Sequence, residues 1–565
     1  MQVINYRCPC CSICRINCNI LPDCYNYTII LLVKQYFCKA SAALRNIAFR
    51  IQKGGYMKLK KFLSIILSRN AAFVLLLLMQ IAFLGVLVYG LRERFYMVYF
   101  ILIAIDIVLA VFIMNKKEPP AYKLSWIVMI SVFPILGGVF YLFLKFSERF
   151  PKTIDRVYQE KVKNILVQDD DVAAELEELC PDSANLARYV ANYGLYPVYR
   201  NCEAEYFKLG EDQFSALIEE LEKAEKYIFM EYFIISKGYM FDTISEIMMR
   251  KAKQGVDVRL IYDGIGTGML NSKKIFDKLI ENGVQCREFN SFRPMMSSVQ
   301  NNRDHRKIVV IDGHTAFNGG ANLADEYINR KERFGHWKDV AVMVRGEAVR
   351  NYLVMFLELW SIVGLEEYNE ISEITQYLPN IPTGGFVQPF SDSPLDDEPV
   401  GKHVYMEMIC NAREYVCITT PYLILDDEMI NVLTFAAKKG VDVRIIVPHI
   451  PDKWYVYMIA WNNYPKLISE GVKVYEYTPG FIHAKTCIAD GKTAVVGTIN
   501  LDYRSFYLHY ESASIFYDCE IAGIIKQDFD DTMSKSHLVT MEDVRKRPIH
   551  KKIIGLILNI FAPLL

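Results

Sequence analysis

Two histidine–lysine pairs carry the chemistry that this sequence can offer. His305 and Lys307 lie two positions apart, as do His483 and Lys485. Residues two apart on a β-strand point to the same face, so each pair would place an imidazole beside an ammonium. An imidazole can attack phosphorus or transfer a proton, and ammonium groups stabilise charge on phosphate oxygens. The pairs therefore predict phosphodiester chemistry that needs neither a metal nor a cofactor.

Each pair begins a longer motif, H-x-K-x4-D-x6-G-x-x-N, with one copy starting at His305 and an identically spaced copy at His483. Chance would supply only about 0.03 copies of H-x-K-x4-D in a chain of this composition. The candidate catalytic residues are His305, Lys307, Asp312, His483, Lys485 and Asp490.

The later positions of the motif predict supporting roles. Asp312 and Asp490 lie in Asp-Gly turns at an odd distance from the histidines, so we expect them to brace the site. Asn322 and Asn500 end the returning strands, where an amide can donate to a phosphate oxygen, and we expect them to bind phosphate.

The motifs belong to an internal repeat. Gly255-Val-Asp-Val-Arg-Leu-Ile in the first half matches Gly440-Val-Asp-Val-Arg-Ile-Ile in the second. In each copy, helical patterns alternate with apolar, β-rich segments such as 227–235 and 415–420, which predicts a buried, mostly parallel sheet. We therefore expect an α/β fold with two lobes related by a pseudo-twofold axis, residues 190–385 and 400–565, which form one active site between them.

The region 57–150 is predicted to be a membrane region. Hydrophobic residues make up 52% of the chain, and the excess lies between residues 72 and 146. Three segments are long enough to cross a hydrocarbon core of about 30 Å: 71–91, 96–114 and 124–144. Pro134 and Gly137-Gly138 leave open whether the third segment crosses or re-enters, and hence on which side the lobes lie. The net charge of −1 argues against nucleic acid as a partner.

Residues 1–56 differ from the rest of the chain. Seven of the 14 cysteines lie between Cys8 and Cys38, and no histidine or second cysteine pair follows at a metal-site spacing. Met57-Lys-Leu-Lys-Lys-Phe has the short basic stretch before an apolar segment that is typical of a bacterial membrane-protein start. We therefore expect translation to begin at Met57 and residues 1–56 to form no part of the working protein.

The paired motifs resemble the H-K-D motifs of the phospholipase D superfamily, and the resemblance extends from about residue 115 to the C-terminus. Further segments resemble bacterial cardiolipin synthases: the membrane entry with Trp126 and Tyr141, residues 302–313, Trp337-Lys-Asp339, residues 448–453, 477–483 and 497–505, and the short apolar C-terminus. This resemblance implies mixed-sheet lobes after transmembrane helices, in a multi-pass protein of the bacterial cell membrane. The implied reaction joins two phosphatidylglycerols through a covalent phosphatidyl-histidine and yields cardiolipin and glycerol.

The resemblance also implies individual roles. Superfamily members whose first motif attacks favour His305 as the nucleophile and His483 as the general acid, although the twofold symmetry allows the reverse. Each imidazole should be fixed in one tautomer by an acid. Glu511, which follows His483 in the second half, fits the family's position, and Asp339, which follows His305 after a longer connection, is its counterpart. Gly320 replaces the usual serine, so we expect one hydroxyl contact to be missing.

Several alternatives remain open. A hydrolytic phospholipase D, or another phosphodiesterase of the superfamily, would share the covalent intermediate and differ only in the access of water. A membrane-tethered nuclease would need a basic groove with aromatic platforms, which the neutral charge does not favour. A non-catalytic scaffold would be expected to have lost one motif. His314, His336 and His509 lack a lysine partner, and we expect them to be bystanders.

Overall fold

The computed structural model of the chain describes residues 85, 95–133, 137–138, 141–142, 162–268, 272–290, 302–364, 385–396 and 398–564. The predictions about residues 1–56 and about the segment 71–91, apart from Gly85, lie outside this range. The chain divides into two compact units, residues 1–95 and 96–565. Both lobes lie in the second unit, and α4 (Phe95–Met114) begins at the last residue of the first.

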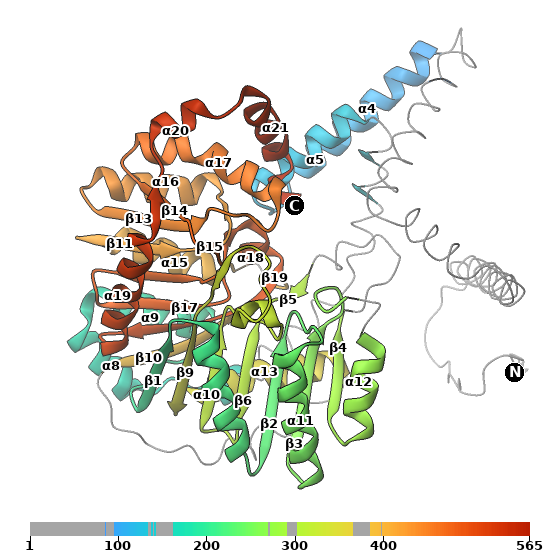
Figure 1. Cartoon of the computed structure of the whole chain (residues 1–565). Helices are drawn as coiled ribbons and strands as arrows, with labels where there is room; N and C mark the ends of the chain where they lie inside the picture. The colour runs from blue at the N-terminus through green and yellow to red at the C-terminus, as the bar shows by residue number, and fades with distance from the viewer. Residues whose placement is uncertain are drawn as a thin grey trace, which may run out of the picture. The chain divides into compact units, whose positions relative to one another are not determined.

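The first lobe is built on a seven-stranded sheet in the order β1-β9-β7-β6-β2-β3-β4 (Figure 1). Its strands are β1 (Cys202–Phe207), β2 (Tyr227–Tyr232), β3 (Asp257–Asp263), β4 (Gln285–Phe289), β6 (Lys307–Ile311), β7 (Thr315–Gly319) and β9 (Ala341–Gly346). Helix α13 (Val349–Gly364) packs on one face. Helices α10 (Gly210–Lys223), α11 (Tyr239–Lys253) and α12 (Ser272–Glu281) cover the other. Because both faces are covered, β2, β6 and β7 are buried along their whole length.

The second lobe follows the same plan, with the sheet order β10-β19-β17-β16-β11-β13-β14-β20. These strands are β10 (Phe386–Asp392), β11 (Tyr415–Thr419), β13 (Asp442–Pro448), β14 (Lys473–Tyr477), β16 (Thr486–Ala489), β17 (Thr493–Gly497), β19 (His509–Tyr517) and β20 (Ser536–Leu538). The helices are α15 (Val400–Asn411), α16 (Asp427–Lys438), α17 (Trp454–Ser469), α18 (Tyr503–Tyr507) and α19 (Glu520–Ser534). The predicted two-lobed α/β fold is confirmed.

Both sheets are mixed rather than mostly parallel. Strands β2, β3 and β4 are parallel, as are β11, β13 and β14. The motif strands β6 and β16 instead run antiparallel to both neighbours. The Asp-Gly turn that follows each motif strand explains its antiparallel pairing with β7 or β17, since a short hairpin returns the chain beside the strand it has just left.

Short elements join and flank the lobes. Strand β5 (Arg303–Asp304) of the first lobe pairs with β19, and β15 (Gly480–Ile482) of the second pairs with β8 (His336–Lys338). The remaining elements are α8 (Asp170–Leu179), α9 (Pro181–Tyr193), η2 (Asp325–Ile328), β12 (Leu423–Ile424), β18 (Leu501–Asp502) and η3 (Ala562–Leu564).

Helices from both ends of the chain meet outside the second lobe. Helix α4 (Phe95–Met114) matches the second predicted span, and α5 (Pro120–Val132) covers the first part of the third. The C-terminal helices are α20 (Met541–Lys546) and α21 (Ile549–Ile560). Ser125 Oγ on α5 donates to the Ile560 carbonyl at 2.7 Å. Among the residues that the structure describes, no helix has the length and apolar character needed to cross a membrane.

Candidate active site

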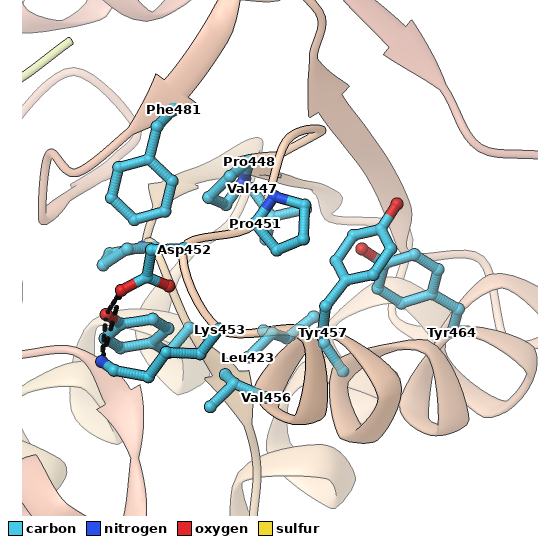
Figure 2. A pocket seen from close by; sticks show the side chains of 13 residues that line it. Leu423, Val447, Pro448, Pro451, Asp452, Lys453, Val456, Tyr457, Tyr464 and Phe481 are labelled. Carbon is cyan, nitrogen blue, oxygen red and sulfur yellow. Dashed lines mark hydrogen bonds and ion pairs between the residues drawn. The ribbon is translucent and has the colours of Figure 1, made fainter. Parts of the chain in front are cut away.

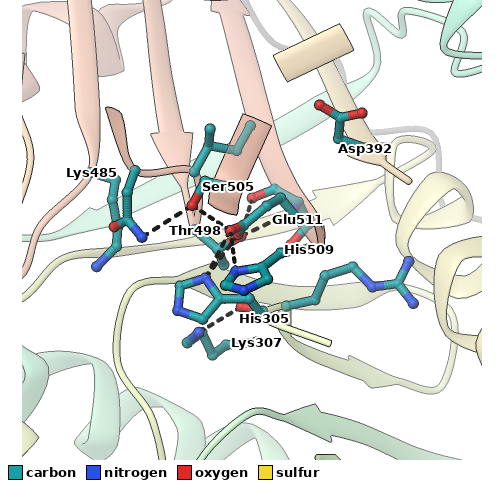
Figure 3. Close-up of polar contacts among 12 residues, drawn as sticks. His305, Lys307, Asp392, Lys485, Thr498, Ser505, His509 and Glu511 are labelled. Atoms are coloured by element: carbon teal, nitrogen blue, oxygen red, sulfur yellow. Dashed lines mark hydrogen bonds and ion pairs between the residues drawn. The ribbon is translucent and has the colours of Figure 1, made fainter. Parts of the chain in front are cut away.

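His305 and His483 lie where the two lobes join (His305 in Figure 3). The His305 backbone N–H donates to the Tyr510 carbonyl at 2.9 Å, and that of His483 donates to the Lys338 carbonyl at 2.7 Å. These bonds continue the β5–β19 and β15–β8 pairings, so each histidine follows a strand that is paired with the opposite lobe. Tyr510, which accepts from His305, directly precedes Glu511, and Lys338, which accepts from His483, directly precedes Asp339.

Each imidazole is therefore bonded to an acid of the other lobe. His305 Nδ1 lies 2.9 Å from Glu511 Oε2, and His483 Nδ1 lies 2.7 Å from Asp339 Oδ2. The family resemblance implied these two acids and counted each from the histidine of its own half, whereas the structure pairs them crosswise. A carboxylate at Nδ1 holds the proton there and leaves the Nε2 lone pair free for chemistry.

The motif lysines bring two buried ammonium groups to the site. Lys307 Nζ donates to the His305 carbonyl at 2.5 Å, and Lys485 Nζ donates to the His483 carbonyl. Lys485 Nζ also lies 2.9 Å from His483 Nδ1, a contact between two donors when Nδ1–H bonds Asp339. Burial lowers the pKa of Lys307 to about 8 and that of Lys485 to about 7.

Both imidazoles are neutral near pH 7 in the free enzyme. Burial, and next the ammonium of the adjacent motif lysine, lowers the pKa of His483 to about 4. The same two causes hold the pKa of His305 well below its ordinary value. At His483 the charge and hydrogen bond of Asp339 oppose the shift.

The two acids are held differently. Glu511 accepts from the hydroxyls of Thr498 and of Ser505, the latter at 2.7 Å. In the first lobe Gly320 takes the place of Thr498, and a β-carbon there would collide with the Asp339 carboxylate. The hydroxyl contact expected to be missing from the first half is thus replaced by direct packing of Asp339 on glycine.

The surroundings of the two imidazoles also differ. The rings of Tyr327, Trp337 and Phe481 lie 5.5, 5.6 and 5.9 Å from the His483 ring, centroid to centroid. Phe481 also lines a pocket with a largely apolar wall (Figure 2). His483 thus lies in an aromatic environment.

The predicted phosphate ligands are buried beside the site. Asn322 Oδ1 accepts from the Ile234 N–H at 2.9 Å, and its Nδ2 donates to the Tyr327 hydroxyl at 2.8 Å. Asn500 Nδ2 donates to Ser505 Oγ at 3.1 Å, five residues later as in the first lobe. Each amide nitrogen keeps a second N–H, so phosphate binding by these residues stays a prediction.

The motif aspartates lie at the opposite ends of β6 and β16 from the histidines. Asp312 accepts from the backbone N–H groups of Glu225, Lys226 and Tyr227, each at 2.7 Å. Asp490 accepts from the equivalent residues 413–415. Both adopt φ of 51° in their turns. These contacts separate the two aspartates from the other four candidate catalytic residues and favour the bracing role.

Replacing Asp312 by alanine should therefore lower stability far more than activity. Loss of three accepted bonds, two of them to exposed N–H groups, should cost about 2 kcal/mol, which corresponds to about 4–8 °C in the melting temperature of a lobe of this size. Calorimetry and turnover below the transition would measure both effects. Asp531→Ala, on the exposed face of α19, is the control. A large loss of turnover in a variant that melts normally would contradict the bracing role.

Sequence reasoning missed His509. The His509 ring centroid lies 5.5 Å from the His305 ring centroid. This is nearly as close as the Phe233 ring, whose centroid lies 5.1 Å from that of His305. His509 Nδ1 is 3.6 Å from Glu511 Oε1. The bystander interpretation did not anticipate that His509 lies against His305 and Glu511. A signal was available, because His509 and Glu511 are two apart on one strand and so share a face.

The sequence analysis also did not predict the buried ion network around Arg306, the residue that follows His305. Arg306 Nε lies 2.5 Å from Glu231 Oε1, and its Nη1 donates to Ser391 Oγ at 3.1 Å. Ser391 in turn donates to the Glu511 carbonyl at 2.9 Å. Arg306 lies between the motif histidine and lysine, so it points to the opposite face and ties the motif strand to the second lobe.

One group of side chains could hold a metal ion. His305, His509 and Glu511 each offer one ligand atom, and these atoms lie within 4.8 Å of one another. No other group of three such residues occurs in the described part of the chain.

Comparisons with known proteins identify relatives of the chain. The family model described as "Cardiolipin synthase, PLD-like domain" matches residues 217–360 and 405–533. A second, "Phospholipase D-nuclease N-terminal", matches residues 101–145. Cardiolipin synthase of Geobacillus kaustophilus is 33% identical over 82% of this chain and 92% of its own. That of Halalkalibacterium halodurans is 32% identical over 82% and 93%.

A solved structure shares the fold. The crystal structure of phosphatidylserine synthase from Haemophilus influenzae superposes with a TM-score of 0.51 at 14% identity, and covers 67% of this chain and 97% of that chain. The family resemblance predicted from the paired motifs is confirmed.

Proposed function

The chain belongs to the cardiolipin synthase family with phospholipase D-like domains, and from that premise we propose that it is a cardiolipin synthase. It transfers the phosphatidyl group of one phosphatidylglycerol to a headgroup hydroxyl of another and releases glycerol. The observation that carries the proposal is the pair of imidazoles at the lobe junction. Each has a buried ammonium from its own motif and a carboxylate from the opposite lobe.

In the first step His305 Nε2 attacks phosphorus. A P–N bond forms, the bond from phosphorus to the glycerol oxygen breaks, and protonated His483 donates its proton to that oxygen. The negative phosphate beside His483 favours the protonated imidazole there. Lys307 and Lys485 stabilise the charge on the non-bridging oxygens. In the second step His483 takes the proton of the incoming hydroxyl, the new P–O bond forms and the P–N bond breaks.

The unequal carboxylates favour this assignment over its reverse. Glu511 shares its charge with two hydroxyls as well as His305, whereas Asp339 bonds only His483 and the Val340 N–H among the described residues. A carboxylate with fewer donors stabilises an adjacent imidazolium more strongly. His483, whose protonated form is stabilised more strongly, is therefore better suited to act as the general acid. His305, which is more easily kept neutral, is better suited to act as the nucleophile.

Hydrolysis to phosphatidic acid is the second candidate, because it would use the same intermediate. Burial favours transfer, since His305 and His483 are only 7% and 6% exposed. Purified full-length protein with labelled phosphatidylglycerol should give cardiolipin and one glycerol per cardiolipin, at a rate that EDTA leaves unchanged. Phosphatidic acid without cardiolipin would refute the synthase proposal, and restoration of an EDTA-treated enzyme by added metal would refute the metal-free mechanism.

We also propose that residues 57–150 anchor the enzyme in the bacterial cell membrane as a multi-pass region, with membrane lipids rather than nucleic acid as its partners. The apolar side chains of α4 are exposed, including Phe100 at 67% and Val108 at 69%. Exposed isoleucines and the exposed Leu556 also lie on α21. Alkaline carbonate extraction of membranes tests this, and release of the protein into the supernatant would count against it.

The buried ammonium of Lys485 predicts an unusual alkaline limit for activity. Its pKa is lowered to about 7 from 10.5 by burial and by Lys307, while Asp339, Glu511 and Asp502 oppose the shift. The ammonium is present below that pH and is lost as pH rises through it. Hence kcat/KM should fall above about pH 7, with an apparent pKa that belongs to the coupled site. Lys485→Arg should move this limb up to about pH 8, where the Lys307 ammonium is lost, at a lower maximal rate. A wild-type profile that is flat to pH 9.5 would contradict the prediction.

A further inference from the structure

The side chains of His305, His509 and Glu511 converge at the junction of the lobes. Figure 3 shows the rings of His305 and His509 next to each other beside the Glu511 carboxylate. The Glu511 oxygens lie 2.9 Å from His305 Nδ1 and 3.6 Å from His509 Nδ1. Ligand atoms about 2.0–2.1 Å from a tetrahedral Zn²⁺ lie about 3.4 Å apart. The two spacings to Glu511 bracket that value, and all three ligand atoms lie within 4.8 Å of one another, so a metal ion could be accommodated with modest side-chain shifts.

We propose that His305, His509 and Glu511 form an inhibitory binding site for Zn²⁺ or a similar divalent transition-metal ion. Two imidazoles and one carboxylate are the ligand types that such ions prefer, and the set leaves room for a water or a phosphate oxygen as a fourth ligand.

His509 makes this site distinctive. It is only 9% exposed, and neither of its ring nitrogens has a hydrogen-bond partner among the described residues. A buried polar atom without a partner is energetically unfavourable, so a His509 ring nitrogen would be stabilised by binding a metal ion. The equivalent residue beside His483 is Trp337, two before Asp339, and an indole offers no metal ligand. The site can therefore form on the His305 side only.

Metal binding would switch off the nucleophile by changing its tautomer. A neutral imidazole carries one proton, which Glu511 holds on His305 Nδ1. When the metal takes the Nδ1 lone pair, that proton must reside on Nε2, and the Glu511 oxygen becomes a metal ligand. No proton is lost overall, but Nε2 no longer has a lone pair with which to attack phosphorus. Removal of the metal restores the original tautomer, so inhibition should be reversible. This inhibitory effect rests on the proposed function, whereas binding itself does not.

Binding is tested on the full chain in detergent, stripped with EDTA and titrated with Zn²⁺ against a fluorescent zinc indicator. The matched variants are His509→Gln, which removes one ligand, and His336→Gln. His336 lies outside the cluster and bonds Tyr477 at 3.1 Å. Wild type and His336→Gln should bind one equivalent more than His509→Gln, and Zn²⁺ should raise their melting temperature further. Equal Zn²⁺ binding by the wild type, His336→Gln and His509→Gln would overturn the proposal. Zn²⁺ bound by cysteines would be the same in all three proteins and would not affect this comparison.

Inhibition is tested by turnover at increasing Zn²⁺. Wild type and His336→Gln should lose activity in parallel and regain it with EDTA. His509→Gln should need at least a tenfold higher Zn²⁺ concentration for half inhibition, and His509→Asn repeats the test with a smaller side chain if glutamine impairs folding. Equal sensitivity of the His509 variants and wild type would overturn the proposal. X-ray absorption of the wild-type Zn²⁺ complex should find nitrogen and oxygen ligands, and an all-sulfur shell would also overturn it. If neither the wild type nor any variant makes cardiolipin, the proposed function is wrong. The binding experiment still shows whether His305, His509 and Glu511 bind Zn²⁺.

Discussion

Replacing His305 by alanine should lower the rate of cardiolipin formation by about 10⁴-fold or more, because it removes the group that forms the covalent intermediate. The residual rate would come from a site that still binds and orients lipid but cannot split the reaction into two steps. The hydrogen bonds of Lys307 and Lys485 to backbone carbonyls and that of His483 to Asp339 do not involve the His305 side chain, so lipid binding should survive. Measurements of initial rate against lipid concentration should therefore show the loss in kcat rather than in KM.

A matched variant separates loss of chemistry from loss of fold. His336→Ala makes the same substitution at an exposed histidine outside the site and should retain nearly full turnover. His305→Ala should melt near the wild-type temperature and still fractionate with membranes. Rapid quenching of the wild type with labelled phosphatidylglycerol should leave acid-labile label on the peptide that contains His305. Full activity of His305→Ala would mean that the two lobes do not share one phosphorus atom.

The motif spacing predicted the strands of the site but not how they pair. The expected β-rich segments 227–235 and 415–420 appear as β2 and β11. The mostly parallel sheet was wrong because a strand buried on both faces is apolar whether its neighbours are parallel or antiparallel. The Asp-Gly turns at Asp312 and Asp490 contained the missing information, since a tight turn after each motif strand requires an antiparallel return.

The crossed acids could not be predicted from spacing. Asp339 and Glu511 were implied by the family resemblance, which placed each one after the motif histidine of its own half. Their partners are set by very short strand pairs between lobes, such as Arg303 opposite His509, which lie far apart in sequence. Pairings this short leave no periodic pattern, and they form only once both lobes have folded. The same pairing brings His509 to His305, which explains why a histidine without a lysine partner belongs to the site.

Replacing His483 by alanine should reduce turnover of phosphatidylglycerol by about 10³-fold or more, but the loss should depend on the leaving group. Glycerol leaves as a strongly basic alkoxide, so its departure needs the proton that His483 supplies. A phosphatidyl ester of p-nitrophenol has a leaving group that needs no such proton. With that substrate, His483→Ala should release a rapid burst of about one p-nitrophenol per enzyme and then stall.

The stall follows because the second step also uses His483, as the base that takes the proton of the incoming hydroxyl. His305→Ala should give no burst with the same ester, since without the nucleophile no phosphatidyl-enzyme can accumulate. Stopped-flow absorbance of the two variants therefore distinguishes the nucleophile from the general acid. A phosphatidyl group trapped on His305 in the stalled enzyme would support the same assignment. The opposite pattern, a burst from His305→Ala and none from His483→Ala, would exchange the two roles. It would also mean that the less hydrogen-bonded carboxylate, Asp339, serves the nucleophile instead of the acid.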